Sequence, residues 1–197
     1  MICSREYVLM KKLKIVLGIT GASGSVLAQR FLETANSEVH LVISSNSPQV
    51  IEYETGMNVE YFKKLASYVY DDHDVAARIS SGSFIFDAMV IMPCSMNTLA
   101  KVASGISDSL ITRAAAVSLK ERRRLIIVPR EMPFSLIALE NMERLTRAGA
   151  IIAPAMPAFY TRPETVDDMI NFVVGRIMDL CGISNDLVKR WKEEERD

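Results

Sequence analysis

The sequence is poor in the residues that most often carry metal or acid–base chemistry. It has only two histidines, His40 and His73, and its three cysteines, Cys3, Cys94 and Cys181, contain no Cys-x-x-Cys pair. Two histidines exclude a three-histidine metal centre, and isolated cysteines fit neither a structural zinc site nor a disulfide scaffold. The first residues do not resemble a secretory leader, so we expect a cytoplasmic protein without a metal. Cys94 is expected in the core and His73 on the surface.

The sequence also lacks an excess of charge of one sign and any long apolar run. Its 23 basic and 24 acidic residues give a formal net charge of -1. Without a basic face for a phosphate backbone, nucleic acid is not an expected partner. Apolar runs such as residues 84–94 are shorter than the roughly 18 residues of a membrane-spanning helix. We therefore expect no membrane span.

What the sequence does have is a regular alternation of short apolar runs and segments of helical period. Strands are predicted at 14–20, 38–45, 87–93, 125–129 and 150–154, and helices at 26–34, 48–53, 107–123, 135–148 and 165–181. Strands joined by helix-length connections form βαβ units and a parallel sheet covered on both faces. The pattern predicts a doubly wound, mostly parallel α/β sandwich of three layers, Rossmann-like or flavodoxin-like.

The chain is long enough for one domain and leaves little room for a second. We assign residues 14–184 to this domain, 1–13 to an N-terminal extension and 185–197 to a charged C-terminal helix or tail. Residues 57–83 show no clear pattern.

A glycine-rich turn, Gly18-Ile-Thr-Gly-Ala-Ser-Gly24, follows the first predicted strand and opens a helix, where backbone N–H groups bind phosphate. Its G-x-x-G-x-x-G spacing differs from the G-x-G-x-x-G of dinucleotide sites. The second strand ends in Ser44, Ser45 and Asn46, where dinucleotide sites carry an acidic residue. These residues favour the phosphate or ribityl chain of flavin mononucleotide (FMN). The alternative is a plain tight turn with serine caps.

Polar residues also follow the later strands, at the edge where open α/β sheets bind ligands. They are Ser95, Asn97 and Thr98 after the third strand, Arg130 and Glu131 after the fourth, and Tyr160 beyond the fifth. A charged pair between prolines is unusual for a core, so Arg130 and Glu131 form either a salt bridge at the rim or part of a site.

Six blocks together resemble the flavin prenyltransferases of the UbiX type, over about residues 14–176. The blocks are GITGASG (18–24), HLVIS (40–44), SSGSF (80–84), PCSMNTLAKVASGISDSLITRAA (93–115), LKERRRLIIVPRE (119–131) and PAMPAFYTRP (154–163). The resemblance implies that the chain is a flavoprotein that joins the dimethylallyl group of dimethylallyl monophosphate to N5 and C6 of reduced FMN. The product, prenylated FMN, would serve a UbiD-type decarboxylase.

The same resemblance implies roles for particular residues. The implied FMN contacts are Gly21, Ala22, Ser23, Ser44, Ser95, Met96, Asn97, Thr98 and Arg130. The implied contacts of the prenyl phosphate are Ser23, Arg113, Lys120, Arg130, Glu131, Tyr160 and Arg176. Ser23, Arg130 and Glu131 are implied to be catalytic, with Ser23 and Glu131 positioning the departing phosphate or relaying a proton. The resemblance further implies a homododecamer with sites between subunits, to which an adjacent chain brings Tyr160 and Arg176.

The chemistry of allylic C–O cleavage agrees with these roles, because it needs cations on a leaving phosphate. Arg113 and Lys120, seven residues apart, share one face of a predicted helix, although a solvated stripe would look the same. Arg176 lies in a mostly apolar helix and indicates a partner, for which Asp179 is the nearest alternative. No aspartate-rich magnesium motif is present, so metal-independent chemistry is expected.

Two other functions stay open at this point. The FMN-dependent cysteine decarboxylases share this fold and use a catalytic histidine with a P-x-M-N motif, whereas here Pro154-Ala-Met156 is followed by Pro157. A non-catalytic flavin carrier would have no need of the side chains that hold a prenyl phosphate.

Overall fold

The computed structural model of the chain describes residues 12–188 and 190. Its six strands form one sheet in the order β3-β2-β1-β4-β5-β6, and every neighbouring pair is parallel. They are β1 (Lys14–Ile19), β2 (Glu38–Ile43), β3 (Tyr68–Asp71), β4 (Ala88–Cys94), β5 (Arg124–Pro129) and β6 (Ile151–Ile152). The predicted doubly wound parallel α/β fold is confirmed. The strand order changes direction between β1 and β4.

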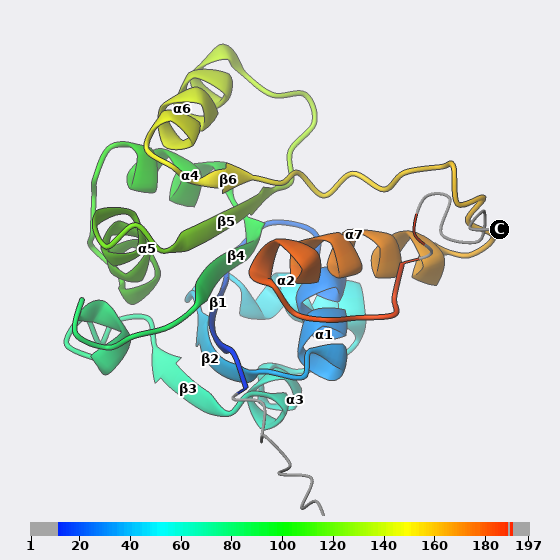
Figure 1. Cartoon of the computed structure of the whole chain (residues 1–197), viewed down its shortest axis with the longest axis horizontal. Helices are drawn as coiled ribbons and strands as arrows, with labels where there is room; N and C mark the ends of the chain where they lie inside the picture. Colours follow the sequence, from blue (N-terminus) through cyan, green and yellow to red (C-terminus); the bar gives the residue numbers. More distant parts are fainter. Residues whose placement is uncertain (1–11, 189, 191–197) are drawn as a thin grey trace, which may run out of the picture.

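Helices cover both faces of this sheet (Figure 1). On one face lie α1 (Ser25–Thr34), α2 (Pro48–Thr55), α3 (Val59–Leu65) and α7 (Val166–Cys181). On the other lie α4 (Met96–Ala103), α5 (Leu110–Lys120) and α6 (Leu136–Arg147). The three-layer arrangement follows the prediction. Among the helices of the described residues, none has both the length and the apolar character needed to cross a membrane.

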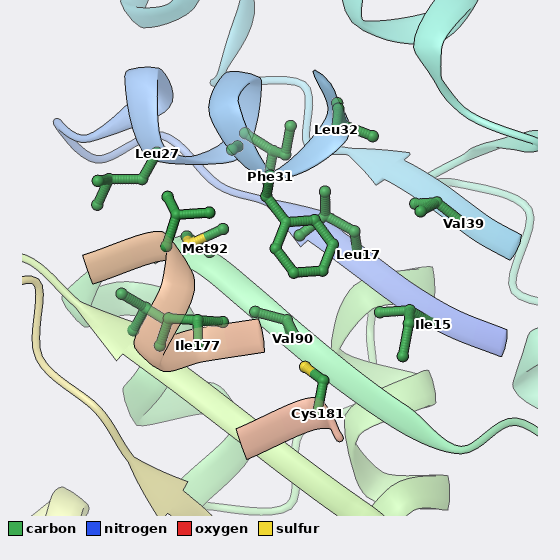
Figure 2. Close-up of a cluster of buried hydrophobic side chains, with 14 of the residues drawn as sticks. Ile15, Leu17, Leu27, Phe31, Leu32, Val39, Val90, Met92, Ile177 and Cys181 are labelled. Carbon is green, nitrogen blue, oxygen red and sulfur yellow. The ribbon is translucent and has the colours of Figure 1, made fainter. Parts of the chain in front are cut away.

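The central strands β1 and β4 read as continuous apolar runs because helices bury both of their faces. Ile15 and Leu17 point to the layer of α1 and α7, whereas Val16 points to the layer of α4 and α5. Figure 2 shows Phe31 of α1 and Ile177 of α7 in the first of these cores. The two cores hold the central strands in place, and with them the loops at the strand ends.

Several short elements were absent from the predicted pattern. Residues 57–83 contain α3, β3 and a 3-10 turn, η1 (Arg78–Ser80), and α4 begins directly after β4. β3 is an edge strand in which Tyr68 and Val69 are exposed, so it has no buried apolar run. α3 and α4 have seven and eight residues, too few for helical periodicity to stand out.

The predicted charged helix at 185–197 is wrong for its described part. Gly182, with φ 82°, ends α7, and residues 183–188 and 190 are not helical. The Asn185 side-chain amide donates to the Gly175 carbonyl at 3.2 Å, so the chain turns back along α7. Residues 1–11 of the predicted extension, with 189 and 191–197 of the tail, lie outside the described residues.

His40 is buried in β2 within a cluster of rings near the edge of the sheet. Its ring stacks on Tyr68 with the centroids 4.8 Å apart, and Arg78 lies 4.2 Å above the same tyrosine ring. Nδ1 is 2.8 Å from Tyr70 Oη, and Nε2 is 3.0 Å from Glu38 Oε1. Burial lowers the pKa of His40, and the hydrogen bond to Glu38 offsets only part of this effect. His40 is therefore neutral in the folded chain at neutral pH.

This buried histidine should make stability depend on pH. Below about pH 6.5 the unfolded chain binds a proton that folded His40 accepts only at lower pH, so folding is opposed. The stability advantage of the wild type over His40→Gln should therefore shrink as the pH falls from about 7.5 to about 5. Denaturant titrations at several pH values measure the free energy of unfolding of both proteins, and the difference between them is this advantage. The exposed His73 provides the control, His73→Gln, and an advantage over His40→Gln that does not change with pH would contradict the prediction.

Candidate functional site

A cavity of about 330 Å³ opens beyond the carboxyl ends of β1, β2, β3 and β4. It lies where the strand order changes direction, which is where open α/β sheets bind their ligands. Five predicted flavin contacts line it: Gly21, Ser44, Ser95, Asn97 and Thr98. They come from the loop after β1, the loop after β2 and the segment from Ser95 into α4, so the fold brings together residues far apart in the sequence.

The loops after β1 and β4 are joined by Thr20, a residue that the sequence analysis did not single out. Its buried hydroxyl donates to the carbonyl of Pro93 at 2.8 Å and accepts the N–H of Ser95 at 2.8 Å. The loops after β1 and β2 touch at Gly21, where a Cβ would lie 2.8 Å from the carbonyl oxygen of Asn46. A side chain at Gly21 would therefore force these two walls of the cavity apart.

The amino end of α1 is already occupied by a carboxylate of this chain. The N–H of Gly24 donates to Glu54 Oε1 at 3.1 Å and to Oε2 at 2.9 Å, and the N–H of Ser25 donates to Oε2 at 2.7 Å. A carboxylate at a helix amino end is stabilised by the helix dipole and would repel a second anion. This corrects the expectation that the glycine-rich turn presents its helix end to a phosphate.

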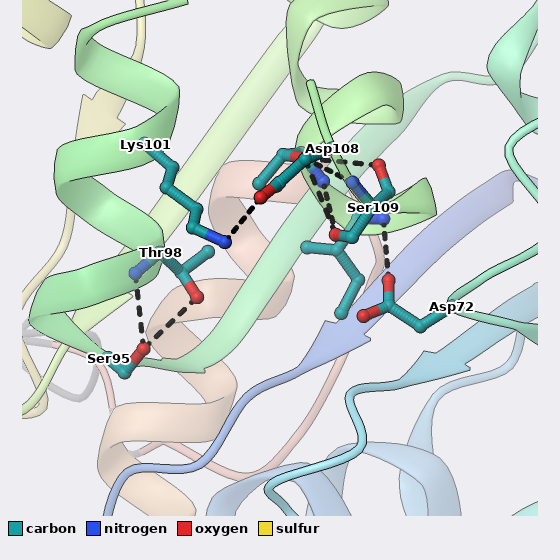
Figure 3. A network of polar contacts seen from close by, with 8 residues as sticks. Asp72, Ser95, Thr98, Lys101, Asp108 and Ser109 are labelled. Carbon is teal, nitrogen blue, oxygen red and sulfur yellow. Dashed lines mark hydrogen bonds and ion pairs between the residues drawn. The ribbon is translucent and has the colours of Figure 1, made fainter. Parts of the chain in front are cut away.

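The amino end of α5 also has its acceptors within the chain. The N–H of Thr112 donates to Ser109 Oγ at 3.4 Å, as part of a capping box. The N–H of Ile111 donates to Oδ1 of the buried Asp72 at 3.0 Å. Asp72 follows β3 in the segment without a clear sequence pattern, so its role became visible only in the structure (Figure 3).

The amino end of α4 differs, because two of its donors remain available. Ser95 Oγ accepts the N–H of Thr98 at 3.2 Å and caps the helix. Among the hydrogen bonds of the described residues, the N–H groups of Met96 and Asn97 have no acceptor. Asn97 and Thr98 also line the cavity. Of the two helices that line the cavity, α4 and α5, α4 is therefore the one whose described first turn has backbone donors left for a ligand.

An ion pair that the sequence analysis missed crosses one side of the cavity. Lys101 Nζ lies 2.7 Å from Asp108 Oδ2, and both residues line the cavity (Figure 3). The hydrogen bond from Lys101 lowers the pKa of Asp108, which stays ionised. Lys101 comes one helical turn after Thr98, a spacing that places both on one face of α4 and could have indicated it. His73 is exposed, as predicted, and also lines the cavity.

The two predicted phosphate contacts on α5 lie at different ends of this helix. Arg113 is exposed and follows the cavity-lining Thr112. Lys120 is the last residue of α5, four residues before β5 begins, so it lies at the opposite edge of the sheet. Its ammonium is 2.7 Å from Glu121 Oε1. Within one chain, Arg113 and Lys120 share a helix as predicted but do not share a site.

Arg130 and Glu131 follow β5 at the same edge of the sheet as the cavity, and both are exposed. Within the described part of the chain no ion pair joins them, which removes the salt-bridge alternative raised by the sequence. Glu131 Oε1 instead accepts the N–H of Met132 at 3.0 Å. Both side chains are positioned to meet a ligand or another subunit.

Tyr160 and Arg176 lie away from the cavity, on the long connection to α7 and on α7 itself (Figure 1). The Tyr160 ring packs edge-to-face on Phe172 with the centroids 5.9 Å apart. Arg176 Nη1 is 2.7 Å from Asp179 Oδ2, the partner considered as an alternative from the sequence. In the described part of the chain neither residue lines the cavity.

The remaining implied contacts adjoin the cavity without lining it. Ala22 and Ser23 continue the turn after Gly21, and Met96 is the first residue of α4. Cys94 is fully buried at the end of β4, and burial raises the pKa of its thiol far above the ordinary value. Cys94 therefore packs in the core, as predicted. Among the described residues no group of three or more His, Cys, Asp or Glu side chains is placed to hold a metal ion.

Comparison with known proteins shows close relatives over nearly the whole chain. A family model described as Flavoprotein matches residues 3–178. The flavin prenyltransferase UbiX of Thermoplasma acidophilum is 61% identical over 180 residues, which cover 91% of this chain and 100% of the relative.

Two crystal structures extend this likeness to three dimensions. AnUbiX (PadA1), in complex with FMN and dimethylallyl pyrophosphate, has a TM-score of 0.87 at 45% identity, covering 92% of this chain and 98% of that chain. The dodecameric FMN-dependent UbiX-like decarboxylase from Escherichia coli O157:H7 has a TM-score of 0.86 at 46% identity, covering 91% and 99%.

The cap that Glu54 places on α1 can be tested by stability. Glu54→Ala leaves the two backbone N–H groups of Gly24 and Ser25 without their acceptor and should lower the free energy of unfolding by about 1–3 kcal/mol. Glu54→Gln retains an acceptor oxygen and should cost less. The matched control is Glu52→Ala, which removes an exposed carboxylate from the same helix and should change the free energy by less than about 0.5 kcal/mol. Equal losses in Glu54→Ala and Glu52→Ala, measured in denaturant, would refute this cap.

Proposed function

This chain belongs to the flavoprotein family and, within it, to the flavin prenyltransferases of the UbiX type, and we propose that it joins the dimethylallyl group of dimethylallyl monophosphate to N5 and C6 of reduced FMN. The product is prenylated FMN, and its recipient is a UbiD-type decarboxylase. The reaction takes place in the cytoplasm.

One observation carries the proposal. Five residues that the family resemblance assigns to FMN line a single cavity at the change in strand order, although they come from three separate segments of the chain. The relative from Thermoplasma acidophilum, which is 61% identical over its full length, is named a flavin prenyltransferase. The crystal structure of AnUbiX, 45% identical, is a complex with FMN and dimethylallyl pyrophosphate. The cavity and the two relatives support the same activity.

In this reaction reduced FMN supplies N5 and C6 as the nucleophilic atoms. The chain's own residues hold the prenyl phosphate and stabilise the charge that develops on it as its C–O bond breaks. Arg113 beside the cavity and Arg130 at the same edge provide charge-assisted hydrogen bonds to the leaving phosphate. Ser23 and Glu131 position this phosphate, which accepts the proton released in the reaction. These cations take the place of a metal ion.

One chain does not hold the complete phosphate site, because Lys120, Tyr160 and Arg176 lie elsewhere on its surface. We infer that neighbouring subunits bring these residues to one another's cavities in a homododecamer. The related protein from Escherichia coli O157:H7 is dodecameric. Large apolar side chains near the proposed contacts support such an assembly. Met132 is 89% exposed, Leu136 and Ile137 are each 70% exposed, and Phe159 is 69% exposed.

The two competing functions have less support. A cysteine decarboxylase of this fold uses a histidine and an asparagine, but Pro157 stands at the asparagine position. His40 is fully buried among rings away from the cavity, and His73, which lines the cavity, lacks that asparagine as a partner. A flavin carrier and a prenyltransferase both bind FMN, and only the second one changes its mass.

The proposed activity is tested by anaerobic incubation of the protein with reduced FMN and dimethylallyl monophosphate. Mass spectrometry of the released flavin should show the addition of one dimethylallyl unit. The addition should require both substrates and should persist after treatment with a chelator, since no metal takes part. FMN that is bound but keeps its mass would refute the prenyltransferase and support the flavin carrier.

Arg130 and Glu131 should matter for chemistry more than for flavin binding. Arg130→Ala and Glu131→Gln should still bind FMN but slow prenylation at least about a hundredfold, the usual effect of losing one charge-stabilising group. Rates are compared at saturating FMN. The controls Arg147→Ala and Glu143→Gln disrupt an exposed 2.7 Å ion pair on α6 and should keep the wild-type rate. Wild-type turnover in the Arg130 and Glu131 variants would remove both residues from the mechanism.

A further inference from the structure

We propose that Lys101 recognises the 5′-phosphate of FMN and makes the cavity prefer FMN over riboflavin. The inference rests on the proposed function, because it takes the cavity to be the flavin site. Lys101 was not among the flavin contacts implied by the family resemblance. Four features of the cavity carry the assignment: its polarity, its charge, the donors of α4 and the ion pair with Asp108.

The polarity of the walls identifies which part of a flavin fits here. Apart from Ile111, the side chains that line the cavity end in hydroxyl, amide, carboxylate, imidazole or ammonium groups. An isoalloxazine ring needs mostly apolar walls, whereas a ribityl phosphate needs hydrogen-bond partners. Arg130, the implied contact of the flavin on the β5 loop, lies outside this lining. The cavity therefore fits the ribityl phosphate end, with the ring directed toward Arg130.

The charges of the lining leave one clear partner for a phosphate. Asp72 and Asp108 contribute carboxylates, and Lys101 is the only lysine or arginine among the lining residues of the described chain. A phosphate monoester carries a charge of about -1.5 to -2 at neutral pH and would be repelled by such walls without a cation. The amino end of α1, the other attractive position, is occupied by Glu54. Lys101 is thus the group that compensates the charge.

The position of Lys101 on α4 adds backbone donors to the same place. Lys101 follows Asn97 by four residues, so both lie on one face of the helix, separated by about 6 Å along its axis. The N–H groups of Met96 and Asn97 at the start of α4 have no acceptor among the described residues. A phosphate between the first turn of α4 and Lys101 would receive backbone N–H bonds and an ammonium together.

The ion pair with Asp108 holds the lysine ready for this role. A lysine ammonium has three donors, and the 2.7 Å hydrogen bond to Asp108 Oδ2 uses one of them. The two side chains are 32% and 51% exposed, so the ammonium remains accessible. Asp108 restricts where Lys101 points, but its own negative charge opposes a phosphate. Removal of the lysine should therefore lower the preference for FMN over riboflavin, and removal of the Asp108 charge should raise it.

The test compares the dissociation constants of FMN and riboflavin for the full chain, measured by quenching of flavin fluorescence. In Lys101→Met, the dissociation constant of FMN should rise about tenfold or more, and that of riboflavin should stay unchanged, because riboflavin has no phosphate. Lys101→Arg should retain part of the preference. The matched control Lys64→Met removes an exposed lysine from α3 and should bind both flavins like the wild type.

Two results would overturn the proposal. An equal loss of affinity for both flavins in Lys101→Met would show that the lysine has a structural role. Affinities for both flavins that equal those of the wild type would show that it has no role in flavin binding. Asp108→Asn provides an independent measurement: it should increase the preference for FMN, and a decrease or no change would contradict the proposal. The wild type distinguishes this proposal from the proposed function. If it prenylates FMN while Lys101→Met keeps the FMN preference, only the role of Lys101 is refuted.

Discussion

The parallel direction of all six strands is the constraint on which the candidate site depends. It places the carboxyl end of each strand, and the amino end of each following helix, at one edge of the sheet. Every such helix end has N–H groups that need acceptors. Glu54 satisfies those of α1, whereas Ser109 and Asp72 satisfy those of α5. Among the described residues, these caps leave α4 as the helix that lines the cavity with first-turn donors for an anion.

The same geometry explains why one chain holds only part of a phosphate site. Helices that connect parallel strands run back toward the amino edge of the sheet. The first turn of α5 therefore lies at the cavity, while Lys120 at its end lies at the opposite edge. α7 likewise carries Arg176 away from the cavity. The lining of this cavity holds two carboxylates and one lysine, so the other cations proposed to hold the prenyl phosphate lie outside it.

The sequence predicted the buried strands correctly and missed a strand that is exposed at the edge of the sheet. β1 and β4 were predicted because both faces are covered, so every position after Lys14 in β1 and every position in β4 is apolar. β3 was missed because an edge strand with exposed Tyr68 and Val69 has no such pattern. Asp72 and His73 follow this strand and were missed as members of the cavity for the same reason. The blocks shared with the UbiX family identified Ser95, Asn97 and Thr98 but not Lys101, because α4 was not predicted and the helical spacing from Thr98 to Lys101 was therefore not used.

The sequence by itself determined the parallel α/β fold, the family and the residue types at the strand ends, because apolar periodicity and the order of long motifs are local properties of the chain. Only the tertiary structure decided which of these residues meet. Glu54 lies 30 residues from Gly24, and Asp72 lies 39 residues from Ile111, and both pairs are joined by hydrogen bonds. Such pairs depend on how α2 and β3 pack beside their neighbours. Local sequence patterns do not report this packing, so the arrangement of the cavity walls became visible only in the folded chain.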